Sequence, residues 1–266
     1  MAVRQDLVAL GKKLVEQGPV KTLHTPRRVR ILYNGVYIAD TTSAVYVWEH
    51  EYYPYFYVPK SSVKEGVLHP SQHSNDAAFQ TATLRVGDRS TDRVLIFADK
   101  GIAEKGKELE GLVRFEFGAV DAWFEEDTPI YVHPKDPFRR VDVLHSTRPI
   151  EVHVNGIVVA KAESSFHLYE TGLPCRYYLP PTAVDRKLLR ESDMATACPY
   201  KGIASYFDLV LDDGDKDRFK DLIWWYRSPN LECAQIAGAL CFYHEKEEVE
   251  ILLDGEVVRK PKTPWS

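Results

Sequence analysis

A thiol, a phenol and an amine stand within four residues of one another in the stretch "CPYKG", at positions 198–202. The glycine lets a ligand approach the backbone closely, and the ammonium group of Lys201 could hold a carboxylate, a phosphate or an oxyanion. The phenol of Tyr200 could donate or accept a proton. We therefore predict Tyr200 and Lys201 as catalytic residues. The alternative is a polar turn with an exposed lysine, and this alternative is favoured over a Schiff-base role of Lys201.

Further side chains that could bind a substrate lie at Cys198 and in the stretch "CRYYLP" at positions 175–180. No histidine is close to Cys198 in the sequence to activate it, so we interpret it as an inert thiol in the wall of the site. Arg176 and Tyr178 share one face of an expected strand, because successive side chains of a strand alternate. Arg176 is a candidate anion clamp, and a surface arginine stacked on an aromatic ring is the alternative.

Aromatic residues are abundant, at 12% of the chain, and we expect two of them to stack on a bound ring. These two are Tyr206 and Trp224. Glu170 ends an otherwise apolar strand and is a further candidate for substrate binding. Since an equivalent glutamate occurs earlier in the chain, a structural carboxylate paired with the backbone or an arginine is the alternative for at least one of them.

Polar residues are also dense in the segment "HPKDPFRRVDVLHSTR", which begins at His133. His133 and Asp136 could form a general base and the carboxylate that orients it, and this makes His133 our third catalytic candidate. Arg140 is a candidate for substrate binding. The favoured alternative is a network that holds the two halves of the chain together.

We expect neither a metal nor a cofactor. The four cysteines form no C-x-x-C pair and no zinc-binding spacing. Pro70 interrupts the helix that His69 and His73 would need to bind a metal together. The sequence contains no P-loop, no glycine-rich dinucleotide fingerprint, no G-x-S-x-G and no H-E-x-x-H motif.

The elements that would position these residues come in two copies. Residues 29–41 and 150–162 each read as an alternating strand, Asn-Gly and a second alternating strand, and Asn-Gly is the preferred pair for a type I′ hairpin turn. The two asparagines, Asn34 and Asn155, are 155 − 34 = 121 positions apart. The same offset relates Glu49 to Glu170 and Tyr57 to Tyr178. It carries residues 198–202 onto 77–81, which lack the thiol, the hydroxyl, the amine and the glycine, so we place the site in the second copy.

The sequence divides into four segments. Residues 1–26 are an N-terminal extension with an amphipathic helix over 4–17, closed by Gly18. Residues 27–128 are a degenerate first unit, and residues 129–147 are a connector. Residues 148–260 are the second unit, which carries the site. Alternating patterns dominate both units. We therefore predict a mainly β fold with a few short helical turns, built as two similar sheet-rich lobes.

Composition limits the classes of function. The formal net charge of −5 argues against a general nucleic-acid binder. No apolar stretch is long enough to span a membrane. The N-terminus is too charged for a signal peptide, and four cysteines without a secretory signal fit a reducing compartment, so we expect a cytoplasmic protein. The oligomeric state is left open.

Several motifs together resemble a known family. "VNGIVVAKAES", "YETGLPCRYYLP", "CPYKGIASY", "WWYRSP" and "IAGALCFY", in this order, look like the DUF427 domain, and the segment at His133 resembles the joint of its tandem members. The resemblance covers nearly the whole chain after residue 25. It implies β-rich lobes similar to β-tent domains, and the family also carries the label of a nucleotidyltransferase domain. The sequence has no Gly-Ser motif followed by a D-x-D pair on a strand, which nucleotidyltransferases would need.

We hypothesise that the second unit binds a small cyclic or aromatic molecule with an anionic or carbonyl group. Acid–base chemistry without a cofactor would then use Tyr200 for proton transfer, Lys201 to hold an oxyanion and Arg176 to orient the substrate. One alternative is a ligand-binding or sensor module without catalysis. Another is nucleotide binding or nucleotidyl transfer.

Overall fold

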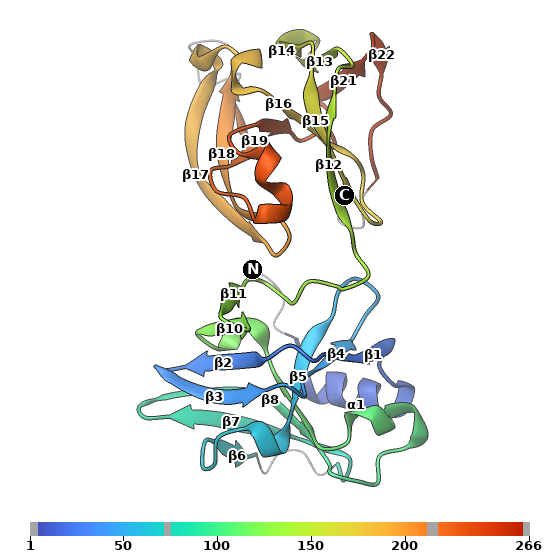
Figure 1. The fold of residues 1–266 in the computed structure, drawn as a ribbon, viewed down its shortest axis with the longest axis vertical. Coiled ribbons are helices and arrows are strands. Elements are labelled where there is room, and N and C mark those ends of the chain that lie inside the picture. The colour runs from blue at the N-terminus through green and yellow to red at the C-terminus, as the bar shows by residue number, and fades with distance from the viewer. Residues whose placement is uncertain (1–4, 72–75, 212–217, 263–266) are drawn as a thin grey trace. The chain divides into compact units, whose positions relative to one another are not determined.

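The computed structural model describes residues 5–71, 76–211 and 218–262 and consists of two similar β-rich units (Figure 1). Contacts within the chain divide it into a first lobe, Met1–Asp136, and a second lobe, Pro137–Ser266. Each lobe pairs a seven-stranded sheet with a four-stranded sheet. The predicted mainly β fold with two similar lobes and an N-terminal helix is confirmed.

In the first lobe the seven-stranded sheet has the order β1-β4-β5-β9-β8-β7-β6, and the four-stranded sheet has the order β11-β10-β2-β3. Neighbouring strands are antiparallel throughout. The strands are β1 Lys21–His24, β2 Val29–Tyr33, β3 Val36–Thr41, β4 Val45–Trp48, β5 Tyr55–Pro59, β6 Leu68–Pro70, β7 Phe79–Val86, β8 Arg89–Phe97, β9 Leu112–Phe115, β10 Ala122–Glu125 and β11 Thr128–Ile130; the 3-10 helices are η1 Lys60–Ser62, η2 Glu104–Leu109 and η3 Phe117–Ala119.

The second lobe repeats this arrangement with the orders β12-β15-β16-β20-β19-β18-β17 and β14-β13-β21-β22. Its strands are again antiparallel to their neighbours. The strands are β12 Val141–Ser146, β13 Ile150–Val154, β14 Ile157–Ala162, β15 Ser165–Glu170, β16 Arg176–Leu179, β17 Leu189–Cys198, β18 Gly202–Val210, β19 Arg218–Tyr226, β20 Leu240–Phe242, β21 Val249–Leu253 and β22 Glu256–Val257; the 3-10 helices are η4 Pro181–Ala183, η5 Arg186–Leu188 and η7 Leu231–Ile236. The turn between β18 and β19 lies outside the described residues.

The main core of each lobe lies between its two sheets. In the second lobe, Ile150, Val152 and Val154 of β13 point inward and pack with Leu179 and Ile223 of the larger sheet. The residues between them on β13 are only partly buried, so the strand has the alternation that a half-buried antiparallel sheet requires. The larger sheet has a second apolar cluster on its other face. Each face of the larger sheet therefore carries an apolar cluster.

The two Asn-Gly pairs form equivalent hairpin tips. Asn34 and Gly35 have φ of 48° and 74°, and Asn155 and Gly156 have φ of 50° and 78°. Positive φ at both central residues is the requirement of a type I′ turn, which matches the right-handed twist of the flanking strands. The hairpins predicted from these dipeptides are confirmed.

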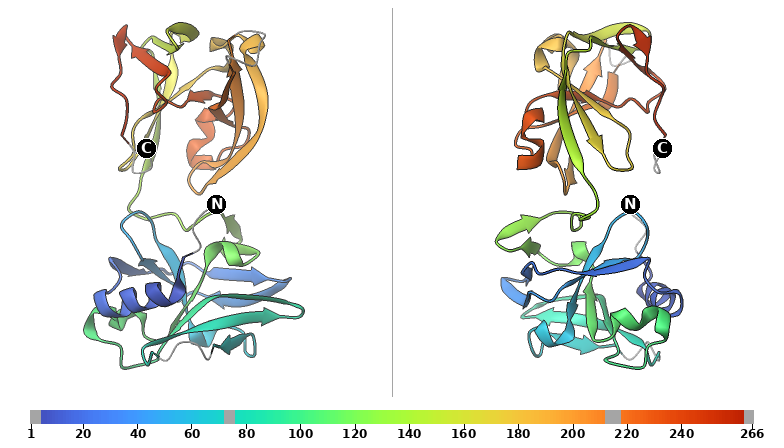
Figure 2. Two further views of the ribbon diagram at one scale, coloured as in Figure 1. Left: turned by 180° about the vertical axis from the view of Figure 1, so that it is seen from behind. Right: turned by 45° about the vertical axis from the view of Figure 1, so that its right-hand side comes forward.

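The N-terminal helix, α1 Leu7–Gln17, begins later than the predicted range 4–17. The carboxylate of Asp6 accepts hydrogen bonds from the first free N–H groups, at Val8 and Ala9, and so fixes the start of the helix. Gly18 ends it with φ of 82°. The buried side of α1 lies against β7, β8 and η2 of the first lobe (Figure 2). The predicted N-terminal extension is thus part of the first lobe's packing.

The predicted connector, 129–147, is divided between the lobes. Its first residues belong to β11, at the edge of the small sheet of the first lobe. Its last residues form β12, an edge strand of the large sheet of the second lobe. The boundary found from contacts lies between Asp136 and Pro137. Among the described residues, no helix is both long and apolar enough to cross a membrane.

The constant offset of 121 fails in one hairpin. Leu84 pairs with Leu68 in the first lobe and Leu209 pairs with Leu189 in the second, which gives 209 − 84 = 125 for β7 and β18. Counting along these strands aligns Lys201 with Asp76, and the counterparts of 198–200 lie outside the described residues. The predicted equivalence of 198–202 with 77–81 is therefore wrong, because the hairpin of the second lobe is longer.

Candidate functional site

A cavity of about 320 Å³ lies on the large sheet of the second lobe. It occupies the face turned away from the small sheet, because its walls belong to the second apolar cluster and not to the core between the sheets. Its lining includes seven residues that the sequence analysis proposed for a site: Glu170, Arg176, Tyr178, Cys198, Lys201, Tyr206 and Trp224. Tyr226, Tyr243 and Glu245 also line it.

Strand register explains why residues far apart in the sequence meet at this cavity. Tyr178 of β16 lies opposite Cys241 of β20, which lies opposite Trp224 of β19, and Trp224 lies opposite Tyr206 of β18. Residues that are paired across neighbouring strands point to the same face of a sheet. One row across four strands therefore supplies three of the aromatic walls.

Lys201 and Glu170 form a largely buried ion pair at the cavity, with their side chains 13% and 7% exposed. Burial alone would lower the pKa of Lys201, but the neighbouring acidic groups of Cys198 and Glu170 outweigh it and the pKa is raised. Lys201 therefore keeps its proton at neutral pH. A charged ammonium can donate hydrogen bonds, whereas a Schiff-base amine or a general base must first lose that proton.

The turn before β18 holds Lys201 in place through Asn230, a residue that the sequence analysis missed. The Asn230 backbone N–H donates to the carbonyl of Lys201 at 3.0 Å, and its side-chain amide donates to the carbonyl of Pro199 at 2.9 Å. Gly202, with φ of 102°, closes the turn in a backbone conformation that favours glycine. Tyr200 is buried and is not among the described residues that line the cavity. The structure therefore places the lysine, and not the tyrosine, at the cavity.

Arg176 binds Glu245 through both of its terminal nitrogens, and its Nη1–Oε2 distance is 2.8 Å. The guanidinium lies 5.4 Å from the ring centre of Trp224. Burial alone would raise the pKa of Glu245, but Arg176 overcomes this effect and the pKa is lowered. Arg176 is thus both stacked and paired. Glu245 follows β20, 69 residues from Arg176, and no local sequence pattern connects the two.

The aromatic walls carry hydrogen-bonding groups. Trp224 Nε1 donates to the hydroxyl of Tyr178 at 3.1 Å, and the hydroxyl of Tyr206 lies 2.7 Å from that of Thr196. The ring of Tyr243 meets Trp224 edge-on with 4.6 Å between the centroids. Burial raises the pKa of Tyr178 and of Tyr243. The two phenols are therefore neutral at physiological pH and can act as hydrogen-bond donors.

Besides Tyr200, two predicted site residues, His133 and Arg140, do not line this cavity. His133 belongs to the first lobe, where its ring stacks on Tyr53 at 4.0 Å and its Nδ1 contacts the carbonyl of Pro134. The nearby Asp136 accepts a hydrogen bond from Trp48 Nε1 at 3.0 Å. Arg140 has an 80% exposed side chain paired with Asp142. Only their proximity in the sequence suggested that these groups form one site.

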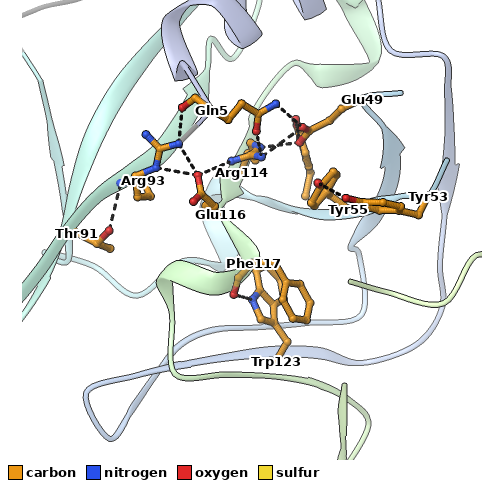
Figure 3. Close-up of polar contacts among 11 residues, drawn as sticks. Gln5, Glu49, Tyr53, Tyr55, Thr91, Arg93, Arg114, Glu116, Phe117 and Trp123 are labelled. Carbon is orange, nitrogen blue, oxygen red and sulfur yellow. Dashed lines mark hydrogen bonds and ion pairs between the residues drawn. The ribbon is translucent and has the colours of Figure 1, made fainter. Parts of the chain in front are cut away.

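The equivalent face of the first lobe is filled by a buried ion pair (Figure 3). Arg114 of β9, opposite Tyr57, stands where the second lobe has Cys241. Its Nε donates to Glu49 at 2.6 Å, and both side chains are 1% exposed. The hydroxyl of Tyr57 also donates to Glu49, at 3.1 Å. The first copy of Glu170 is therefore neutralised by an arginine that the second copy lacks.

Bulky side chains and α1 complete the filling of that face. Leu10 and Leu14 of α1 pack with Phe79 and Leu112 in one buried cluster. By the strand registers, the counterparts of Phe79 and Leu112 in the second lobe are Ala204 and Ala239. The positions that Phe79 and Leu112 occupy under α1 in the first lobe are thus held by smaller residues in the second.

No group of three or more His, Cys, Asp or Glu side chains that could hold a metal ion occurs in the described part of the chain. Two stretches, residues 21–126 and 142–255, match the model of one protein family, described as a domain of unknown function (DUF427). No curated protein matches the chain. The two matched stretches lie one in each lobe.

Proposed function

Because this chain belongs to the DUF427 family and carries two copies of its domain, we propose that only the second copy binds a ligand, a small cyclic or aromatic molecule with a carbonyl group. The observation that carries the proposal is the cavity beside Lys201 and Glu170, on a face that the first copy fills. Duplicated scaffolds with one open and one filled face fit a division between a ligand-binding copy and a structural copy.

The size and walls of the cavity support a small ring compound. A volume of about 320 Å³ falls at the lower end of the range for small-molecule sites, which are mostly apolar with a few placed polar groups. Tyr206, Trp224, Tyr226 and Tyr243 offer ring faces and edges for stacking. A flat ring would use this surface more fully than a flexible chain.

The charges at the cavity support a ligand with no net charge. Each cation, Lys201 and Arg176, already has a carboxylate partner, Glu170 and Glu245 respectively. A phosphate or carboxylate would have to approach both glutamates, and like charges at short range repel. A carbonyl group can accept a hydrogen bond from the ammonium or from a neutral phenol without disturbing either pair.

The pKa directions favour binding over proton transfer. A raised pKa keeps Lys201 charged, and raised pKa values keep Tyr178 and Tyr243 neutral, across the physiological range. General acid–base catalysis works best with a group that titrates near the working pH. We therefore favour a ligand-binding or sensor module over an acid–base enzyme. A cytoplasmic location remains part of the proposal, since the four cysteines are free thiols.

Ligand-observed NMR with a set of small aromatic carbonyl compounds tests this function. Leu173 is partly buried at the cavity wall, so Leu173→Trp should narrow the cavity while the lobe stays folded. Its counterpart in the first lobe is Tyr52, which is 49% exposed, and Tyr52→Trp is the matched control. We expect saturable binding that Leu173→Trp weakens at least about tenfold and Tyr52→Trp leaves unchanged. Absence of binding from the whole set, or equal effects of both variants, would overturn the proposal.

A further inference from the structure

The ion pair of the first lobe already holds an amide group. Arg114 Nη2 donates to the side-chain oxygen of Gln5 at 3.0 Å, and the side-chain nitrogen of Gln5 donates to Glu49 at 3.5 Å (Figure 3). The cation thus contacts the carbonyl of the amide, and the carboxylate contacts its N–H. Gln5 directly precedes the N-cap of α1, the helix that covers this face.

The second lobe presents the same two chemical groups to its cavity. Glu170 is the counterpart of Glu49, and it too is paired with a cation, Lys201. The cation comes from the turn before β18, whereas Arg114 comes from β9. In both lobes a buried carboxylate is paired with a cation whose side chain is at least largely buried.

An ion pair of this kind can bind an amide and remain intact. An ammonium has three N–H groups and a carboxylate has two oxygens with about four acceptor positions, so their mutual contact leaves capacity on both. The first lobe shows the arrangement directly, since Arg114 and Glu49 stay paired while both contact Gln5. Lys201 and Glu170 both line the cavity, so a ligand there could use their remaining capacity.

We infer that the ligand of the second lobe carries a cyclic amide, a lactam or a cyclic imide. Its carbonyl accepts a hydrogen bond from Lys201, its ring N–H donates to Glu170, and its ring stacks beside Trp224. This inference rests on the proposed function and specifies the ligand class. A carboxylate is repelled by Glu170, an amine by Lys201, and an ester or lactone has no N–H to offer the carboxylate.

Isothermal titration calorimetry with two compounds of the same shape tests the inference. Isoindolinone is a bicyclic lactam, and phthalide is the lactone in which an oxygen replaces the N–H. We expect the wild-type protein to bind isoindolinone about tenfold more tightly than phthalide, or better. The reason is that the lactone places an acceptor against the Glu170 carboxylate.

Variants of the carboxylate identify the group responsible. Glu170→Gln keeps the shape, and its amide can turn to donate to the lactone oxygen, so the preference for isoindolinone should fall below about threefold. Glu163→Gln, at an exposed carboxylate of the same lobe, should leave the preference unchanged. If Glu170→Gln fails to fold, the wild-type comparison of lactam and lactone decides the inference on its own.

The outcomes separate this inference from the proposed function. Equal binding of isoindolinone and phthalide, or binding of other ring compounds but not of isoindolinone, overturns the cyclic-amide inference and leaves the ligand-binding function standing. A preference that persists undiminished in Glu170→Gln also overturns it. Failure of every ring compound to bind, or equal effects of Leu173→Trp and Tyr52→Trp on binding, overturns the proposed function itself.

Discussion

The two lobes share a fold and differ in how one face of the large sheet is used. In the first lobe Arg114, Phe79 and Leu112 fill this face together with α1. In the second lobe Cys241, Ala204 and Ala239 take the equivalent places, and a cavity lies on the face. The difference shows that one face of a duplicated scaffold can be filled or left with a cavity by the size of a few side chains, while the strand pairings are kept.

The difference also has an energetic side. A filled apolar face stabilises the fold through the burial of apolar surface and through dispersion contacts. A cavity lacks such contacts in proportion to its size. The first lobe adds the ion pair of Arg114 with Glu49, which depends on both partners being present because each is desolvated. The second lobe keeps its ion pairs at the edge of the cavity, where they can meet a ligand. In this comparison the first lobe is the copy whose face is covered by packed side chains and α1.

The largest expected effect is on the filled face. Arg114→Met leaves the carboxylate of Glu49 buried without a cation, so unfolding of the first lobe should become easier by about 3–5 kcal/mol. Urea denaturation followed by circular dichroism measures this change. Adding Glu49→Leu should recover much of the loss, since it removes the unpaired charge. A loss below about 1 kcal/mol in the single variant would mean that the ion pair does not support the first lobe.

A smaller effect is expected where α1 meets the sheet. A methyl group at Gly11 would lie 2.4 Å from the Phe79 ring, so Gly11→Ala should cost about 1–3 kcal/mol although alanine favours an isolated helix. In a chain that also carries Phe79→Ala, the residue type of the second lobe, Gly11→Ala should add almost no further loss. Thermal unfolding of the four proteins gives the coupling. If Gly11→Ala costs the same stability with and without Phe79→Ala, close packing of α1 on Phe79 is contradicted.

Replacing the asparagine at a hairpin tip should have a smaller effect on stability, and the loss should differ between the two lobes. Asn34→Ala and Asn155→Ala both place alanine at positive φ, which costs about 1 kcal/mol. Asn34 also donates through its side chain to the carbonyl of Val86 at 2.9 Å, so its replacement should cost about 1 kcal/mol more. Asn155→Gly, which permits the turn, is the control and should be close to neutral. Equal losses for the two alanine variants would show that the Val86 contact does not contribute.

The smallest expected difference concerns pH. Burial lowers the pKa of His167 and His244 in the second lobe and of His50 in the first. The unfolded chain therefore takes up protons first as the pH falls below about 6.5, and the stability that each neutral ring contributes above this pH is lost below it. Hydrogen exchange, measured separately for each lobe, reports the stability of that lobe. Between about pH 7 and 5 the second lobe should lose more stability than the first. A larger loss in the first lobe would contradict this assignment.

Much of the fold could be predicted from the sequence because its signals are local. The Asn-Gly pairs at Asn34 and Asn155 require positive φ, and the alternating residues around them can bury only one face of a strand. The same alternation placed Arg176 and Tyr178 together on one face, and both line the cavity. Local patterns of this kind can be recognised without knowing which distant residues meet in the fold.

The candidate site was harder to predict because its partners meet across strands. Glu245 and Asn230 hold Arg176 and the turn at Lys201, and neither lies near its partner in the sequence. Tyr200 stands next to Lys201 in the chain but is buried away from the described lining of the cavity. Adjacent residues of a turn point in different directions, so proximity in sequence does not make them one site.

The sequence by itself determined the duplication, the β content and the hairpin tips, since these depend on the conformational preferences of short stretches. Only the tertiary structure decided which cation neutralises each glutamate: Arg114 for Glu49, and Lys201 for Glu170. It also decided that α1 covers one copy of the face and that the longer hairpin of the second lobe changes the sequence offset between the copies from 121 to 125. Pairing and coverage depend on distances between residues far apart in the chain, and those distances exist only once the sheets have packed.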